Sequence, residues 1–277
     1  MRNTIWKITS KGGRYSLKDL WAYRYLLSQL VHRDFVALYK QTILGPIWFL
    51  INPILTTSVF CLVFGKLIDI ATHGIPKSLF YLTGITAWGY FYECFTRTST
   101  VLKDNVNLFG KIYFPRIIVP ISISISMLIR FGIQLILVLI TIMFYRIIGI
   151  TIPTTTAILL VPLILLLIAF QAIGLGLLIA SFTIKYRDLA ILVSFGLQIG
   201  FYVTPVIYPI SSVPSNLKTW LSLNPMTSAI ELFRYAIIGE GDFTVLSVSY
   251  TCLACLGVMI LGFNAFCRAE KTFIDTI

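Results

Sequence analysis

The sequence predicts an all-α, polytopic membrane protein with six transmembrane helices. Of its 277 residues, 57% are hydrophobic and only 12% are charged, which leaves too little polar surface to cover a soluble globule of this size. The apolar stretches are about 20 residues long, the length that a transmembrane helix requires, and they lack the alternation of barrel strands. Because lipid offers no hydrogen-bond partners, such stretches must satisfy their backbone groups internally, as helices.

The N-terminal 45 residues form the first predicted unit, a cytoplasmic segment that contains an amphipathic helix from Leu17 to Thr42. Apolar residues such as Leu27 and Leu30 fall on one face of this helix, and polar residues fall on the other. This pattern is typical of a helix that lies in the membrane interface. Gly45 and the proline after it are expected to end the helix before the first span.

The second predicted unit, residues 46–266, holds the six spans, and residues 267–277 form a cytoplasmic tail. The spans are expected at Ile47–Leu67, Leu79–Leu102, Ile121–Ile148, Ile158–Phe182, Leu189–Tyr208 and Val245–Phe266.

The distribution of basic residues predicts the orientation of these spans. With both termini in the cytoplasm, the inner segments hold 15 lysines and arginines and the outer loops hold four. This asymmetry follows the positive-inside rule. It also explains the formal charge of +11 without a nucleic-acid partner, because the basic residues sit in short loops beside apolar stretches.

The segment Thr204–Asp242, between spans five and six, is too apolar for a plain loop and too often interrupted by proline for a span. Within it, Met226–Ile238 is expected to form a helix that ends at Gly239. A helix of about 13 residues reaches only partway across the hydrocarbon layer, so we predict a re-entrant segment. A helix lying flat on the outer surface is the alternative.

Catalytic and metal-binding patterns are missing from the sequence. It contains no GxxxxGK[ST] loop, so ATP-driven work would need a partner chain. The two histidines, His32 and His73, fall in no zinc-binding pattern, and we expect no metal or cofactor in this chain. A membrane enzyme of glycan assembly is therefore a weaker hypothesis than a transport subunit.

The second span carries an aromatic stripe. Its members share a narrow sector at 100° per residue and are Tyr81, Trp88, Tyr92 and Phe95. Aromatic rings on a pore face would stack against sugar rings, so the stripe is a candidate channel lining. A packing surface or a lipid-facing aromatic belt explains the same periodicity equally well.

Three charged residues fall inside apolar stretches. Glu93 and Arg97 are four residues apart on the second span and are expected to pair. Arg130, in the third span, is expected either to extend towards the interface or to meet Glu93. Structural pairing is favoured over a proton relay. An ion-driven secondary transporter would ordinarily show more intramembrane carboxylates and an internal repeat.

Three sequence blocks resemble the ABC-2 type permeases that export O-antigen and related polysaccharides. The blocks are DFVALYKQTILGPIWFLINPIL (34–55), FGKIYFPRIIVPIS (109–122) and LNPMTSAIELFRYAI (223–237). The resemblance implies a homodimer that encloses one channel in the bacterial inner membrane. Two copies of a separate ATPase subunit would bind ATP and Mg²⁺, and the cargo would be an undecaprenyl-diphosphate-linked polysaccharide. Capsule and teichoic-acid exporters share this architecture.

The resemblance also implies roles for particular residues. The N-terminal helix would flank the cytoplasmic entrance with Arg33, Asp34 and Lys40. The segment Thr204–Asp242 would form a periplasmic gate that includes Pro205, Tyr208, Pro209, Pro225, Glu231 and Arg234.

The loop Lys103–Arg116 is the predicted contact with the ATPase. It is the longest inner loop between predicted spans, and it mixes apolar and polar side chains as protein interfaces do. The residues expected to take part are Asn107, Phe109, Tyr113 and Arg116. A solvated turn whose basic residues merely set the topology is the alternative.

Overall fold

The computed structural model describes residues 21–40, 45–70, 72, 74–111, 114–153, 156–183, 186 and 188–274. These residues form helices and no strands, as the sequence predicts. The longer helices are α2 (Arg24–Tyr39), α3 (Trp48–Phe60), α4 (Lys77–Ser99), α7 (Ile118–Ile147), α8 (Val161–Thr183), α9 (Leu189–Val203), α11 (Pro225–Ile238) and α12 (Val245–Ile274). The shorter ones are η1 (Gly45–Ile47), η2 (Cys61–Leu67), α5 (Val101–Asp104), α6 (Val106–Lys111), η3 (Thr156–Leu160), η4 (Ile210–Ser212) and α10 (Ser215–Ser222).

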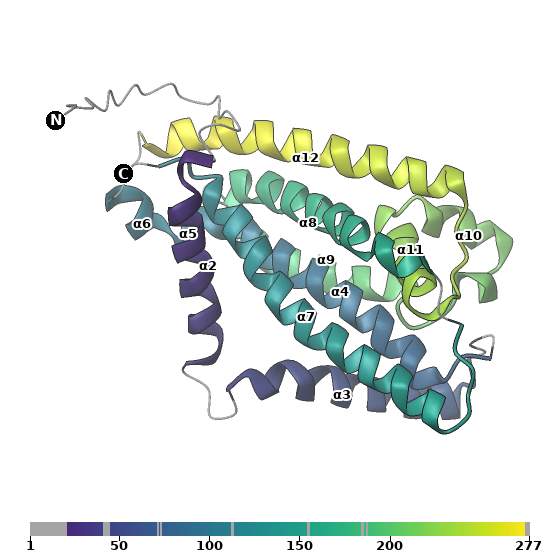
Figure 1. Cartoon of the computed structure of the whole chain (residues 1–277). Coiled ribbons are helices and arrows are strands. Elements are labelled where there is room, and N and C mark those ends of the chain that lie inside the picture. Colours follow the sequence, from purple (N-terminus) through teal and green to yellow (C-terminus); the bar gives the residue numbers. More distant parts are fainter. Residues whose placement is uncertain are drawn as a thin grey trace.

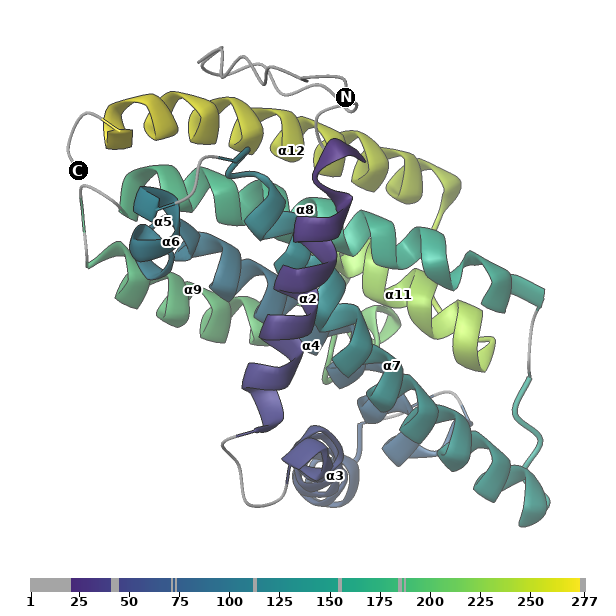
Figure 2. The same cartoon turned by 60° about the vertical axis from the view of Figure 1, so that its left-hand side comes forward.

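The bundle has two distinct ends. Figure 1 shows α5 and α6 at one end and α10 and α11 at the opposite end, with α12 running between them. Helix α2 lies beside α7 at the α5 and α6 end and runs across the long axes of α3 and α12 (Figures 1 and 2). A helix lying in a membrane interface would have this direction relative to spans that cross the membrane.

Helix α4 is the centre of the bundle. Fifteen of its 23 residues are buried, and it packs against α3, α7, α8, α9 and α11. Its many threonines, tyrosines and glycines are unlike the composition of the other long helices, because a helix surrounded by protein does not need an apolar surface. Thr83 and Thr86 turn their hydroxyls back to carbonyls one turn earlier in the helix, which satisfies these buried groups.

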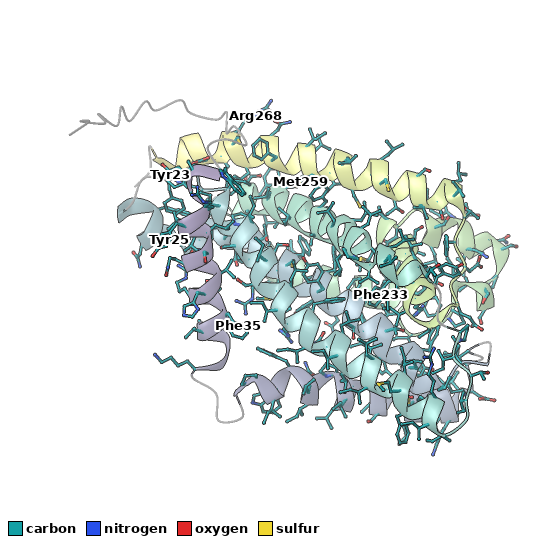
Figure 3. The ribbon with its side chains drawn as sticks, in the orientation of Figure 1. Tyr23, Tyr25, Phe35, Phe233, Met259 and Arg268 are labelled. Atoms are coloured by element: carbon teal, nitrogen blue, oxygen red, sulfur yellow. The ribbon has the colours of Figure 1, made fainter. Side chains whose placement is uncertain are left out.

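Glycines allow α8 and α12 to approach closely. A Cβ atom on Gly262 would lie 2.0 Å from the carbonyl oxygen of Gly174, and one on Gly174 would lie 2.7 Å from the backbone nitrogen of Met259. Small residues of this kind bring membrane helices into backbone contact, where van der Waals packing replaces the hydrophobic effect. Figure 3 labels Met259 on α12 and Phe233 of α11 in the interior of the bundle.

Four helical stretches are long and apolar enough to cross a membrane by length and composition. They are Gly45–Leu67, Ile118–Ile147, Thr156–Thr183 and Val245–Glu270. These match the predicted spans one, three, four and six. The predicted second span corresponds to α4, which is long enough at 23 residues but less apolar for the reason given above.

The predicted fifth span is shorter than expected. Helix α9 ends at Val203 instead of Tyr208, because Thr204 adopts an extended conformation before Pro205. Its 15 residues correspond to about 22 Å, less than the hydrocarbon thickness of about 30 Å. The last helix differs in the other direction: α12 continues through Ile274, beyond the predicted end at Phe266.

The first span ends in a π-helical turn, η2, at Cys61–Leu67. Lys77, at the start of α4, donates a hydrogen bond to the carbonyl of Gly65 in this turn and pairs with Asp69 at 2.5 Å. The π-helical geometry leaves the Gly65 carbonyl free to accept this hydrogen bond, so Lys77 links the end of the first span to the start of α4. Its ammonium group also holds the pKa of the Asp69 carboxyl below its usual value.

Candidate functional site

The predicted aromatic stripe is divided by the fold. Tyr81 is completely buried and packs edge-on against Phe60 and Phe80, whereas Tyr92 is 38% exposed. Tyr81 therefore lies in the packed interior of the single chain, and its place in a channel stays a prediction. The sequence could not separate the two tyrosines, because helical periodicity places residues on a face without showing what covers that face at each height.

Trp88 and Phe95 have a third environment. Both are nearly buried, with Phe91 between them: Trp88 lies against Phe91 and Phe201, and Phe95 stacks on Phe91 with ring centroids 5.7 Å apart. They border an apolar cavity of about 390 Å³ between α4, α8 and α9. Of the four stripe residues, only Tyr92 presents much of its ring to the outside.

A charged cluster joins α4 to α7. Arg130 Nη1 donates to Glu93 Oε1 at 2.5 Å, and Arg97 Nε approaches Glu93 Oε2 at 3.4 Å. The guanidinium of Arg130 also lies over the ring of Phe49, 5.3 Å from its centroid. Glu93 thus contacts both arginines. Arg130 was expected either to extend towards the interface or to meet Glu93, and the structure shows the contact with Glu93.

This cluster carries one net positive charge and is partly open. The side chains of Arg97, Glu93 and Arg130 are 40%, 23% and 19% exposed. Charged side chains within membrane segments are costly unless they are paired or face water, and here all three are paired. Glu93, Arg97 and Arg130 form a charged patch on α4 and α7, which we call the polar face below.

The segment between α9 and α12 folds as a sequence of short helices. Helix α11 begins with Asn224 as N-cap, whose side chain accepts a hydrogen bond from Met226 N at 3.0 Å, and has Pro225 at its first turn. It ends where Gly239 takes the left-handed conformation with φ of 75°, as the sequence predicts. Asn224 also donates to Thr204 Oγ1 at 3.0 Å, which ties the start of α11 to the end of α9.

The two proline turns before α10 hold the chain close to α9. Pro205 and Pro209 flank a stretch in which Val206 and Ile207 are buried, and the Tyr208 hydroxyl donates back to the carbonyl of Val203 at 3.0 Å. Proline cannot donate a backbone hydrogen bond, so the chain turns here instead of continuing the helix.

A buried arginine anchors α11 to the rest of the bundle. Arg234 is fully buried and pairs with Glu231 at 3.0 Å, and it donates to the carbonyl of Val206 at 2.6 Å. Its guanidinium also lies 3.8 Å from the centroid of the Phe80 ring. The space for it exists because residue 84 is glycine: a Cβ atom there would lie 2.7 Å from Arg234 Nη2.

The opposite end of the bundle holds the residues predicted to contact an ATPase. Phe109 is only 7% exposed, packs against Phe114 and lies beneath the guanidinium of Arg116. Arg116 in turn pairs with Glu270 of α12 at 3.6 Å. Phe109 and Arg116 are therefore internal contacts, whereas Asn107 is exposed together with Lys103 and Asp104. Tyr113 lies outside the described residues.

The predicted entrance residues lie on α2. Arg33 donates to the neighbouring Asp34 at 2.7 Å, and Lys40 is exposed at the end of the helix. Leu30 is buried against the bundle, whereas Tyr25, labelled in Figure 3, is 75% exposed. The helix is amphipathic in the structure over Arg24–Tyr39, and the predicted ends at Leu17 and Thr42 lie outside the described residues.

Sequence reasoning missed several partners. Lys218 pairs with Asp242 at 2.5 Å, and Glu270 pairs with Arg116. Local patterns could not show these pairs, because the partners are at least 24 residues apart in the sequence. Gly84 carried no visible signal, because its importance comes from an arginine 150 positions later in the chain.

These observations define a polytopic helical membrane protein with partly exposed charges on its central helices and a series of short helices at one end. The chain belongs to the ABC-2 type transporter family, whose sequence model matches residues 25–238. This confirms the resemblance seen in the three sequence blocks.

Curated relatives match over most of the chain. The O-antigen export system permease protein RfbA of Myxococcus xanthus is 30% identical over 221 residues, which cover 79% of this chain and 82% of the relative. The protein of the same name from Klebsiella pneumoniae is 24% identical and covers 91% and 95%. The capsule polysaccharide export inner-membrane protein CtrC of Neisseria meningitidis is 24% identical and covers 92% and 95%.

Proposed function

We propose that this chain is the channel-forming permease subunit of an ATP-driven exporter that moves a lipid-linked, O-antigen-like polysaccharide across the bacterial inner membrane. The similarity over most of the chain to O-antigen export permeases carries this proposal. The sequence has no GxxxxGK[ST] loop, which supports the proposal that ATP and Mg²⁺ are bound by a partner ATPase.

The proposed assembly is a homodimer with two ATPase subunits, in which each permease chain crosses the membrane six times. Helix α4 counts as a span because it is long and central, and α9 counts as a short one that the 204–242 segment completes. Both ends of the chain are assigned to the cytoplasm by the excess of basic residues in the inner segments.

In this arrangement the 204–242 segment is the periplasmic gate, and it dips into the membrane. Support comes from the burial of α11: eleven of its fourteen residues, including Glu231 and Arg234, are shielded from solvent. A helix lying flat on the membrane surface would bury one face only.

The polar face of Glu93, Arg97 and Arg130, together with the exposed ring of Tyr92 elsewhere on α4, is the proposed contact with the cargo. Its partly exposed arginines would attract the diphosphate of an undecaprenyl-diphosphate carrier, and the Tyr92 ring would stack on sugars. This assignment replaces the buried Tyr81 by residues that are accessible in the folded chain.

A capsule polysaccharide is the second candidate cargo, favoured by the similarity to the Neisseria protein. A teichoic acid is a third, on the shared architecture alone. An ion-driven secondary transporter is less well supported, because α4 carries a single carboxylate, Glu93, within a span and that carboxylate is paired.

The function is tested by deleting the gene in its host and following the polymer. We expect the lipid-linked polymer to accumulate on the inner face of the membrane and to disappear from the cell surface, with recovery when the chain and its ATPase are supplied together. Unchanged surface polymer in the deletion strain would refute the proposal, and purification with no ATPase partner would refute its ATP-driven part. Sugar analysis of the accumulated polymer separates O-antigen from capsule.

A further inference from the structure

Helix α6 carries Asn107, a side chain of the predicted ATPase contact, yet the position of this helix depends on tertiary contacts. Its six residues are too few to form a stable helix alone. Among the side chains described in α6, only Phe109 is buried, while Val106 and Leu108 are half-buried. Asn107 is exposed. The orientation in which α6 presents Asn107 is therefore set mainly by the groups that hold Phe109.

Phe109 is held by two groups that follow α6 in the chain. The ring of Phe114 lies against it with centroids 5.8 Å apart, and the guanidinium of Arg116 lies 5.2 Å from its centroid. A guanidinium over an aromatic ring is attracted by the negative face of the ring. Only 10% of the Arg116 side chain is exposed, so this contact is made where most water is excluded.

Glu270 on α12 places a negative charge beside Arg116. The Oε1 atom of Glu270 lies 3.6 Å from Arg116 Nε, and only 11% of the Glu270 side chain is exposed. A buried charge is costly unless an opposite charge lies nearby. Without the carboxylate, Arg116 would lower its free energy by moving towards water, and Phe109 would lose the cation that covers it.

The inner part of α12 is a firm attachment for this contact. Phe266 and Cys267, one turn before Glu270, are buried. Two turns before Glu270, Gly262 lies so close to Gly174 of α8 that neither position has room for a Cβ atom. Figure 1 shows α5 and α6 at the end of the bundle where α12 finishes. Glu270 therefore connects a short helix to a long helix that is itself fixed.

We propose that Glu270 is a positioning residue, which acts through Arg116 and Phe109 to hold α6 so that Asn107 faces the ATPase. This inference rests on the proposed function, because it assumes that an ATPase binds at this end of the chain. A segment that is already ordered loses less conformational entropy on binding, so its partner binds more tightly. Removal of the Glu270 charge should therefore free α6 and weaken ATPase binding without changing the contact surface itself.

The mobility of α6 is measured without the ATPase. The two cysteines that are not buried, Cys61 and Cys252, are replaced by serine, and a spin label is attached to Asn107→Cys. Glu270→Gln should raise the mobile fraction of this label at least about twofold, because a short helix opens locally when its contacts are lost. The same label at Leu261, which is 61% exposed on α12, should not change, because α12 stays attached to α8.

Capture of the separately purified ATPase subunit is measured with unlabelled chains, so that the label does not disturb the contact. Glu270→Gln should weaken capture by about tenfold, since α6 then has to be ordered on binding. Arg268→Gln is the matched control, because Arg268 lies two residues before Glu270 but is exposed, as Figure 3 shows. This control should change neither the label at position 107 nor capture.

A double variant, Arg116→Gln with Glu270→Gln, decides the question if Glu270→Gln does not fold. It leaves neither charge buried without its partner, so the main cause of misfolding is removed. It also removes the cation over Phe109, and it should therefore mobilise the label at position 107 as well.

An unchanged label at position 107 in the folded variants would overturn the proposal. An equal change in Arg268→Gln or at Leu261 would overturn it too, because the effect would then be a general loosening of the chain. So would unchanged capture by a variant whose α6 is mobile. By contrast, a wild-type chain that captures no ATPase would refute the ATP-driven part of the proposed function, and the label at position 107 would still decide whether Glu270 holds α6.

Discussion

Arg234 on α11 donates a 2.6 Å hydrogen bond from Nη2 to the backbone carbonyl of Val206, 28 residues earlier in the chain. The same guanidinium pairs with Glu231 and lies over the ring of Phe80 on α4. One buried side chain thus connects the turn directly after α9, helix α11 and the central helix α4. Because Gly84 makes room for it, this contact depends on three separate parts of the sequence.

We predict that Arg234→Gln destabilises the protein by about 3–5 kcal/mol, because removal of one partner leaves Glu231 buried without its counter-charge. Unfolding followed in detergent measures this loss. The control is Lys218→Gln, which breaks the exposed pair with Asp242 and should cost less than about 1 kcal/mol. Equal effects of the two substitutions would show that Arg234 does not anchor α11.

Tyr92 and Tyr81 should respond differently to truncation. Tyr92→Ala should reduce export with little change in stability, because this ring is partly exposed on α4. Tyr81→Ala should lower stability by about 3–5 kcal/mol, because it removes a fully buried ring. Surface polymer and thermal unfolding are measured for both variants, and full export by a stable Tyr92→Ala protein would remove Tyr92 from the path.

Glu93 is predicted to act as a structural partner of two arginines and not as a proton carrier. Glu93→Gln should therefore lower export while the shape of its pH dependence stays the same. The double variant Glu93→Gln with Arg130→Gln should lose less than the sum of the single losses, since the two residues share one contact of 2.5 Å. A changed pH profile in Glu93→Gln would favour a proton relay instead.

Substitutions in the loop Lys103–Arg116 should affect either stability or capture of the ATPase, depending on whether the side chain is buried or exposed. Phe109→Ala is expected to destabilise the protein by about 3–5 kcal/mol, since its ring is buried against Phe114. Lys103→Glu combined with Asn107→Ala changes only exposed side chains and should weaken capture of the ATPase by about tenfold, or about 1.4 kcal/mol. Undiminished capture by this stable double variant would place the contact elsewhere, most directly on α2.

The orientation is tested by cysteine labelling in intact cells. The five native cysteines are free and would first be replaced by alanine. Single cysteines at Lys77, Arg146 and Lys218 should react with a membrane-impermeant reagent, and one at Lys271 should react only after permeabilisation. Labelling of position 271 from the outside would contradict the six-span topology.

The sequence by itself determined the class of the protein and most of its elements. Length and hydropathy of the apolar stretches predict helices near their observed bounds, because each membrane helix satisfies its own backbone hydrogen bonds without help from neighbours. The start and end of α11 also follow from local signals, namely the Asn224–Pro225 cap and Gly239. The pairing of Glu93 with Arg97 was accessible because residues four apart lie on one helical face.

Only the tertiary structure decided which side chains are accessible. Tyr81 and Tyr92 share a helical face, yet one is buried and the other exposed, because Phe60 and Phe80 cover the first and no such ring covers the second among the described contacts. Phe109 looked like an interface residue and is internal, since Phe114 and Arg116 fold over it. Likewise, the space that Gly84 leaves for Arg234 arises where α4 meets α11. Periodicity describes one helix at a time, whereas burial depends on which distant segments pack against it.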